Sequence, residues 1–195
     1  MNTSRRTNFP WWRFAIPFLL QLAIILIVPA KSAYTYNFGT RAVLQTIPVD
    51  PYDLLRGYSQ TLSYDISSIN SLKKFPGGDE LAKGDTFYVT LEVDILSPKL
   101  PPAPSKIIKI TPELPQDLAQ FQVALKGNVV KYNRVNYGLE TYYMPESQRK
   151  QLNKKIRELQ RDSEGKRPFV VEIKVDRWGN SVPISLWLKD KQYTF

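Results

Sequence analysis

Hydrophobic and polar positions divide the chain into two parts with different patterns. No residue from Phe14 to Ala30 is charged, and Gln21 is the main polar interruption of this apolar run. After Lys31, short runs that alternate apolar and polar residues are separated by proline and glycine. The pattern predicts a cytoplasmic N-terminus and membrane segment within residues 1–32 and a β-rich domain over residues 33–195.

The apolar run has the length and the flanking residues of a membrane-spanning helix. A helix from Trp11 to Ala30 would rise about 1.5 Å per residue and reach about 30 Å, the thickness of a hydrocarbon core. Tryptophan at the start of such a helix is typical of the headgroup region. We therefore expect the chain to bind the lipid bilayer through large apolar and aromatic residues of this helix. These anchor residues are Trp11, Trp12, Phe14, Phe18, Leu19, Leu22, Ile25 and Leu26.

Positive charges before the apolar run predict the orientation of the chain. Arg5, Arg6 and Arg13 favour a cytoplasmic N-terminus, so the C-terminal domain of this single-pass cell-membrane protein would lie outside the cytoplasm. A cleaved signal peptide is the alternative, because Ala30 and Ser32 are small residues of the kind that a signal peptidase needs. The length of the run and its tryptophans favour an uncleaved anchor, and both interpretations export the domain.

The remaining chain is expected to be mainly β (α+β). We expect a compact antiparallel β sandwich or barrel-like domain with one basic amphipathic helix. Two closing strands within Phe169–Leu188 are joined by a turn at Asp176–Asn180, where Gly179 marks the reversal. Lys126-Gly127-Asn128 indicates another hairpin turn. The other predicted strands are Ala42–Pro48, Gln60–Ile66, Thr86–Leu96, Lys106–Ile110, Phe121–Leu125, Val129–Asn133 and Tyr137–Tyr143.

The basic amphipathic helix is predicted from Pro145 to about Glu164. Pro145 suits the first helical position, and Gly165 suits the position after the last turn. A narrow apolar stripe would face the sheet, and the other faces are rich in lysine and arginine. This basic surface could contact anionic headgroups or an acidic partner, and a solvated helix face is the alternative.

The composition narrows the chemistry that the domain can perform. The chain contains no cysteine and no histidine, which removes thiolate nucleophiles, imidazole bases and the commonest transition-metal ligands, and we expect no cofactor or metal. Its formal net charge of +9, from 27 basic and 18 acidic residues, is compatible with an anionic membrane surface, an anionic polymer or simple solubility. No basic block is interleaved with aromatic residues, so we expect no binding to nucleic acid.

The segment from Pro48 to Ser67 is expected to form a strand, a turn and a second strand. Pro51 fixes its own φ and biases Asp50 toward an extended conformation, and Gly57 lets the chain reverse. Arg56 could form a bidentate ion pair with an aspartate of the same turn, or bind a carboxylate or phosphate of a ligand. The second strand would place three residues on its buried side: Leu62, Tyr64 and Ile66.

Two separated segments of the chain carry a recognisable set of motif residues. The first segment contains Pro48, Asp50, Pro51, Leu54, Arg56, Gly57, Leu62 and Tyr64. The second contains Tyr137, Gly138, Glu140, Pro145 and Glu146. Together they resemble the signature of the GDYXXLXY family of bacterial membrane-anchored proteins. The family's Gly-Asp-Tyr is Gly57-Tyr58-Ser59 in this chain, so the acidic residue after the glycine is missing.

The resemblance implies a cell-envelope location and association with a polytopic membrane protein, without implying a reaction. We expect a membrane-anchored, non-enzymatic interaction domain that acts as an accessory or scaffold to a polytopic membrane protein or another envelope component. One alternative is a hydrolase that uses Ser59 with Lys73 or Lys74. Another is a pair of carboxylates, Asp50 with Glu140, acting on glycans. An ion pair between Glu140 and Arg56 would join the two motif segments in space.

Overall fold

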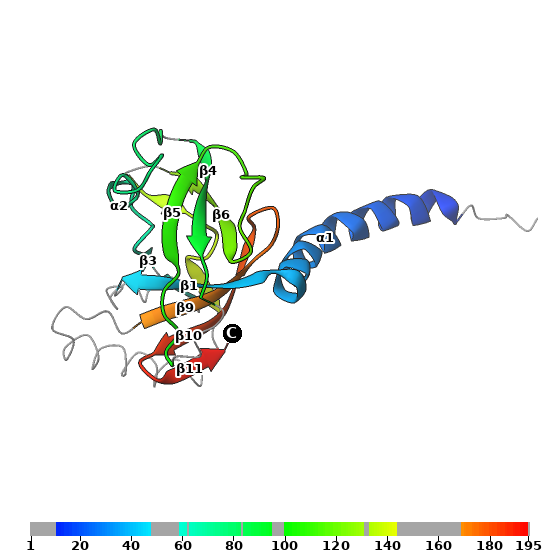
Figure 1. Cartoon of the computed structure of the whole chain (residues 1–195). Helices are drawn as coiled ribbons and strands as arrows, with labels where there is room; N and C mark the ends of the chain where they lie inside the picture. The colour runs from blue at the N-terminus through cyan, green and yellow to red at the C-terminus, as the bar shows by residue number, and fades with distance from the viewer. Residues whose placement is uncertain are drawn as a thin grey trace, which may run out of the picture.

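A long helix projects from a β-rich body in the computed structural model of the chain (Figure 1). The helix, α1, spans Trp12–Phe38, and a single short turn of helix, α2, spans Ile69–Leu72. The structure describes residues 11–47, 59–61, 63–82, 84–94, 100–130, 133–143 and 169–194. All of the strand pairs in these ranges are antiparallel, which confirms the prediction of a mainly β chain built from antiparallel sheets.

The first strand after α1 lies inside a five-stranded sheet. β1 (Thr40–Ile47) pairs with β9 (Phe169–Val175) along most of its length, and its last two residues pair with β3 (Ser63–Tyr64). β9 then pairs with β10 (Ser181–Leu188), and β10 pairs with β11 (Lys191–Thr194). The strand order is β11-β10-β9-β1-β3, so the first strand of the chain and its last three strands lie in one sheet.

The middle of the chain forms a second sheet and a small ribbon. The second sheet has the order β5-β4-β6-β7, and β2 pairs with β8 in the ribbon. β4 is the centre of the second sheet, because it pairs with both β5 and β6. The bounds of these strands are Ser59–Thr61 (β2), Thr86–Glu92 (β4), Lys106–Thr111 (β5), Gln122–Val129 (β6), Val135–Asn136 (β7) and Thr141–Tyr143 (β8).

Both larger sheets contribute to one hydrophobic core. Phe87, Val89 and Leu91 alternate along β4, and all three have no exposed surface. Val171 and Ile173 of β9 belong to the same cluster and are equally buried. Apolar residues recur with a period of two in these strands because one face of each strand packs against the core.

The predicted hairpin turn at Gly127 is wrong. Residues on both sides of Gly127 belong to the single strand β6, where Gly127 pairs with Phe87 of β4. A Cβ atom at this position would lie 2.8 Å from Phe87 Cζ and 2.8 Å from Tyr137 Cε1. Glycine is present because two aromatic rings pack over the strand backbone, and not because the chain turns.

Replacing Gly127 with alanine is expected to reduce the free energy of unfolding by about 1–3 kcal/mol, since overpacking forces the neighbouring rings to move. Chemical denaturation of the wild type and the variant measures this loss. Adding Phe87→Leu supplies the control, because it removes one of the two rings that the new methyl group would meet. The double variant should lose less than the sum of the two single changes; an additive loss would contradict the steric explanation.

Other predicted boundaries also differ from the structure. The predicted strand Gln60–Ile66 contains β2 and β3, which pair with different strands, and a turn follows Tyr64. The predicted strand Tyr137–Tyr143 is a strand only from Thr141, where β8 begins. The predicted strand Val129–Asn133 is also wrong in the residues described: β6 ends at Val129, and Asn133 has a φ of 62°. β11 was not predicted. The expected helix Pro145–Glu164 lies outside the described residues.

The closing hairpin agrees with its prediction. The turn from Asp176 to Asn180 joins β9 to β10, and Gly179 has a φ of 84°.

α1 is longer than expected, because it continues to Phe38. Among the described residues, no single helix meets the length and hydropathy of a membrane span. Trp12–Ile27 and Pro29–Phe38 meet these criteria together, with a bend of 42° between them.

Candidate functional site

The described parts of the two motif segments lie side by side. β2 follows directly after the first motif's Gly57-Tyr58, and it pairs with β8 of the second segment. In this ribbon Ser59 is opposite Tyr143, and Thr61 is opposite Thr141. Segments that are far apart in the sequence therefore form one local structure.

Two buried tyrosines cross-connect these segments, and we call them the tyrosine clasp. The Tyr64 hydroxyl donates a hydrogen bond of 2.8 Å to the Leu139 carbonyl oxygen. The Tyr137 hydroxyl donates one of 2.8 Å in the opposite direction, to the Ile66 carbonyl oxygen. Tyr64 is fully buried, and Tyr137 is 6% exposed. The hydroxyl of each tyrosine thus donates to a buried backbone carbonyl oxygen of the other segment, which water cannot reach.

The turn between Tyr137 and Glu140 fixes one half of the clasp. Gly138 has a φ of 76°, a conformation that glycine adopts without strain. The Glu140 carboxylate accepts a hydrogen bond from the Tyr137 backbone N–H at 2.6 Å, and the Asn136 side chain accepts one from Gly138 N–H at 2.7 Å. Burial, assisted by the charge of Glu140, raises the pKa of Tyr137 well above its usual value, so its hydroxyl remains a donor.

Several predicted site residues lie outside the described residues. The structure places Tyr64, Tyr137, Gly138 and Glu140, and it brings all four into or beside the clasp. The ion pair of Glu140 with Arg56 and the carboxylate pair of Glu140 with Asp50 both stay predictions. Those outside the described residues are Pro48, Asp50, Pro51, Leu54, Arg56, Gly57, Leu62, Pro145 and Glu146.

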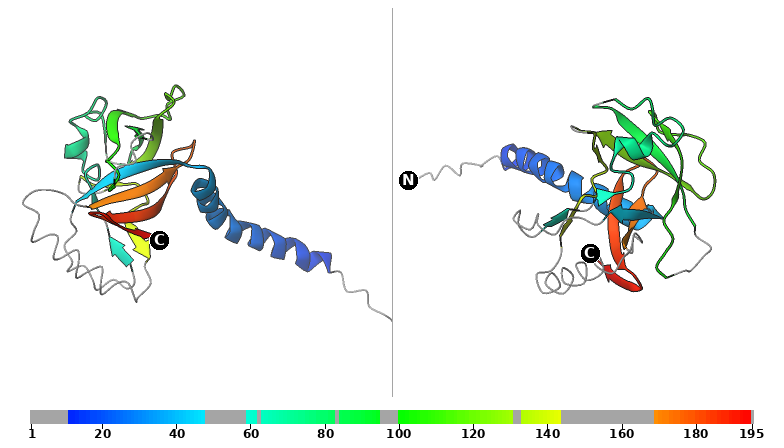
Figure 2. Two further views of the ribbon diagram at one scale, coloured as in Figure 1. Left: turned by 60° about the horizontal axis from the view of Figure 1, so that its bottom comes forward. Right: turned by 90° about the vertical axis from the view of Figure 1, so that its left-hand side faces the viewer.

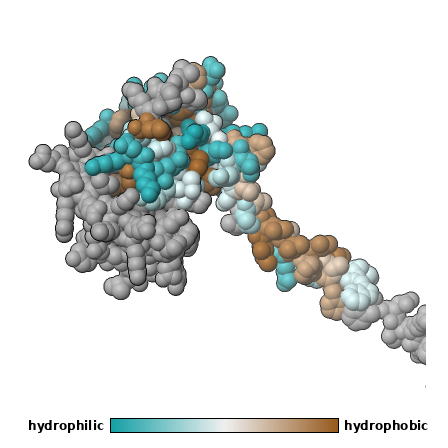
Figure 3. Space-filling view, turned by 90° about the horizontal axis from the view of Figure 1, so that it is seen from below, coloured by the Kyte–Doolittle hydropathy of each residue, from teal (hydrophilic) through white to brown (hydrophobic). Residues whose placement is uncertain are grey.

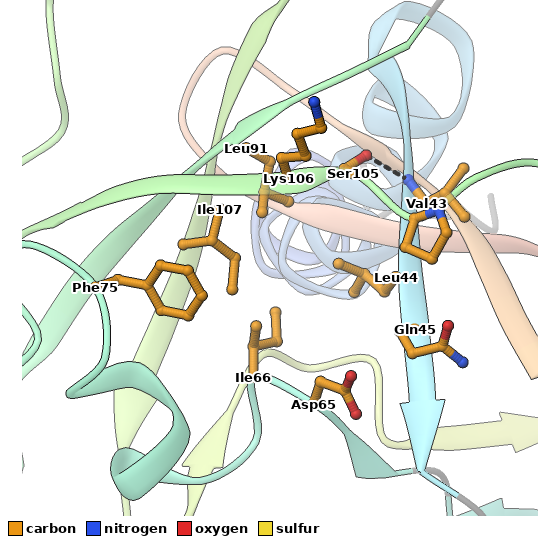
Figure 4. A pocket seen from close by; sticks show the side chains of 11 residues that line it. Val43, Leu44, Gln45, Asp65, Ile66, Phe75, Leu91, Ser105, Lys106 and Ile107 are labelled. Carbon is orange, nitrogen blue, oxygen red and sulfur yellow. Dashed lines mark hydrogen bonds between the residues drawn. The ribbon is translucent and has the colours of Figure 1, made fainter. Parts of the chain in front are cut away.

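An apolar cavity of about 430 Å³ opens next to the clasp, and the sequence alone did not indicate it. Figure 4 shows Leu44 of β1, Ile107 of β5, Ile66 and Phe75 around this space, with Asp65 and Lys106 among the lining residues. Ile66 belongs to both features, because its carbonyl oxygen accepts the bond from Tyr137 while its residue lines the cavity.

Ser105 connects β1 to the segment before β5 at the wall of the cavity. Val43 N–H donates to Ser105 Oγ at 3.0 Å, and Ser105 N–H donates to the Val43 carbonyl oxygen at 2.8 Å. These two bonds, one of which is drawn in Figure 4, attach the segment before β5 to the free edge of β1. The mainly apolar lining suits an apolar side chain or another small apolar group.

Catalytic groups are not assembled at this site by the residues that the structure describes. Lys73 and Lys74 are exposed, so neither amine is desolvated as a lysine base requires. Ser59 lies in β2, opposite Tyr143. Across the described ranges, no group of three carboxylates lies close enough together to hold a metal ion.

A second polar cluster attaches α1 to the β9–β10 turn. The Thr35 hydroxyl of α1 donates to the Asp176 carboxylate at 2.8 Å, and both residues are buried. The same carboxylate accepts bonds from the backbone N–H groups of Trp178 and Asn180 and from the Asn180 side chain. Burial alone would raise the pKa of Asp176, but these hydrogen bonds outweigh it, so the pKa is lowered from its usual value.

The comparison with protein families agrees with the two motif segments. The sequence model of the GDYXXLXY protein family matches residues 21–186. The chain belongs to the GDYXXLXY family. The match begins within the apolar part of α1 and ends in β10, so it includes both halves of the clasp in this GDYXXLXY protein. The comparisons found no match among curated proteins and none among solved structures.

Proposed function

We propose that this GDYXXLXY protein is a membrane-anchored, extracytoplasmic interaction domain that is not an enzyme. α1 holds it in the cell membrane as a single-pass protein with a cytoplasmic N-terminus. The body outside the cytoplasm, which we infer to be a β sandwich formed by the two larger sheets, acts as an accessory or scaffold. Its partner is a polytopic membrane protein or another component of the envelope.

The observation that carries this proposal is the exposed apolar surface of α1. The eight anchor residues from Trp11 to Leu26 are each between 40% and 78% exposed. Figure 3 shows that hydrophobic residues follow one another along the part of α1 that projects from the domain. So large an apolar surface is unfavourable in water, and a lipid bilayer would cover it.

The domain also has features that suit binding rather than chemistry. Its apolar cavity lies between β1 and β5, next to the two motif segments. The tyrosine clasp fixes the position of Ile66 at the cavity wall, which limits the ordering cost when a partner side chain enters. The absence of histidine and cysteine from the sequence agrees with a binding role.

Two charges in the middle of α1 are expected to abolish membrane attachment. Leu19→Asp with Leu22→Asp places carboxylates in the predicted hydrocarbon region, where each is strongly unfavourable. Vesicle flotation of the full-length protein measures attachment. Leu19→Ala with Leu22→Ala is the matched control, because it keeps the segment apolar. Unchanged flotation of the aspartate variant would contradict the anchor, and mass spectrometry of the mature N-terminus distinguishes an anchor from a cleaved signal peptide.

Binding by the domain is tested in cells with a photo-crosslinking amino acid. Phe75 lines the cavity and is suitable for the probe, and Lys109 of β5 is an exposed control position that does not line it. We expect a crosslink to one membrane protein from position 75 and not from position 109. The crosslink should persist when residues 11–30 are replaced by an unrelated membrane span. A crosslink that is lost with this replacement would assign the interaction to α1 instead of the domain.

A further inference from the structure

The junction between α1 and the β9–β10 turn carries exposed aromatic and basic residues that the proposed function does not use. We call it the junction surface, and its members are Tyr34, Tyr36, Phe38, Lys174, Arg177 and Trp178. Phe38 is 73% exposed and Trp178 is 45% exposed. Figure 2 shows the β9–β10 turn beside the end of α1 from which β1 begins.

These residues form two sets of contacts, one around Trp178 and one around Lys174. The Tyr34 ring lies 5.0 Å from the Phe38 ring and 5.3 Å from the Trp178 ring, measured between centroids. The Arg177 guanidinium carbon lies 4.3 Å from the Trp178 ring centroid. The Lys174 ammonium lies 5.4 Å from the Tyr36 ring centroid and also bonds to the Tyr36 carbonyl oxygen. Aromatic rings and cations are thus interleaved across α1 and β9.

The charge of the junction surface is positive. Arg177 is exposed, Lys174 is partly exposed, and Lys31 lies one turn before Tyr34 on α1. Asp176 of the β9–β10 turn and Glu172 of β9 are both buried and hydrogen-bonded, so neither presents its carboxylate to solvent. The exposed positive charge is complementary to anionic lipid headgroups.

The position of the junction surface along α1 matches the headgroup layer. If the span ends at Ala30, Tyr34 lies four residues, or about 6 Å, beyond the hydrocarbon core. The headgroup layer on each side of a bilayer is about 5–8 Å thick. Trp178 contacts Tyr34 and therefore has a similar depth. Tryptophan and tyrosine favour this layer, because one end of the ring system is apolar and the other is polar.

We propose that the junction surface docks on the anionic headgroups of the outer leaflet and so fixes the orientation of the domain on the membrane. This inference rests on the proposed membrane anchor. The Asp176–Thr35 bond holds the β9–β10 turn against α1, so Trp178 and Arg177 reach the headgroups together with the helix. Aromatic rings supply the interfacial contact, and the basic residues select anionic lipid.

Trp178 fluorescence in vesicles tests the docking directly. The full-length protein carries Trp11→Phe and Trp12→Phe, which leave Trp178 and the buried Trp187 as the fluorophores. Vesicles of phosphatidylcholine, with or without phosphatidylglycerol, contain a lipid with a nitroxide on its headgroup as quencher. We expect quenching to be about twofold stronger in the anionic vesicles than in the neutral ones. Trp178→Phe on the same background gives the contribution of Trp187.

Charge reversal supplies the matched controls. Lys174→Glu with Arg177→Glu should reduce the quenching in anionic vesicles to the neutral level, while flotation stays unchanged. Lys73→Glu with Lys109→Glu makes the same change in net charge at exposed positions away from the junction, and it should leave the quenching unaltered.

The outcomes separate this inference from the proposed anchor. If the full-length protein without charge reversals does not float with vesicles, both the proposed anchor and the proposed docking are overturned. Normal flotation with equal quenching in neutral and anionic vesicles, or with no quenching of Trp178, would overturn the docking alone. Quenching that occurs in pure lipid but is lost in native membranes containing the same nitroxide lipid would show that a protein covers the surface, and would also overturn the lipid proposal.

Discussion

Tyr64→Phe is expected to reduce the free energy of unfolding by about 1–3 kcal/mol, because it leaves the buried Leu139 carbonyl without its hydroxyl donor. Tyr137→Phe should have a similar cost through the Ile66 carbonyl. Removing the whole side chain in Tyr64→Ala adds a cavity in the core, and the loss should reach about 3–5 kcal/mol. Denaturant titration followed by circular dichroism measures all three losses.

The double variant of the two tyrosines shows whether the clasp acts as a unit. Both hydroxyls bond to backbone within the same pair of segments, so their effects should couple by about 0.5–3 kcal/mol. Tyr88→Phe on β4 is a control at a partly exposed tyrosine and should cost less than about 0.5 kcal/mol. Strictly additive losses for Tyr64→Phe and Tyr137→Phe would show that the two bonds are independent, which would contradict the clasp.

Asp176→Ala is expected to cost about 2–4 kcal/mol, because the Thr35 hydroxyl and the N–H groups of the β9–β10 turn lose a charged acceptor together. Thr35→Val removes one donor and keeps the shape, so it should cost about 1 kcal/mol. Thermal unfolding of the detergent-solubilised protein compares the two variants. A cost for Asp176→Ala no larger than that for Thr35→Val would show that the turn does not depend on this carboxylate.

The contribution of Asp176 should also depend on pH in a definite direction. Its pKa is lower in the folded chain than in the unfolded chain. The stabilisation is therefore complete above the unfolded value of about 3.9 and is lost as the pH falls through the folded value. The stability difference between the wild type and Asp176→Asn should stay constant near neutral pH and shrink below about pH 4. A difference that changes between pH 6 and 8 would assign the effect to another group.

The alternation of apolar and polar residues and the position of glycine were enough to predict the core strands and the closing hairpin. The alternation of Phe87, Val89 and Leu91 requires only that one face of β4 be buried, and Gly179 needs only the geometry of its own turn. The prediction of a turn at Gly127 was wrong because glycine is equally suited to a turn and to a close contact with an aromatic ring. Sequence spacing contains nothing that distinguishes the two, since the rings come from Phe87 of β4 and from Tyr137, directly after β7.

The candidate site could be predicted in part. Tyr64, Tyr137 and Glu140 were selected by motif, but their bonds depend on which backbone acceptors the fold places beside them. The cavity could not be predicted, because its walls come from β1, β5 and the turn after β3. The Thr35–Asp176 bond joins residues 141 positions apart, and neither residue type is unusual where it stands.

The pairing of β1 with β9 constrains how the protein acquires its fold. Thr40 is opposite Val175, so the first strand to follow α1 finds its main neighbour near the C-terminus. A chain exported behind an N-terminal anchor would deliver β1 across the membrane first and β9 almost last. Until then the edge of β1 that pairs with β9 would stay open, and pairings between such distant residues form slowly. The five-stranded sheet would therefore be completed only after nearly the whole chain had been exported.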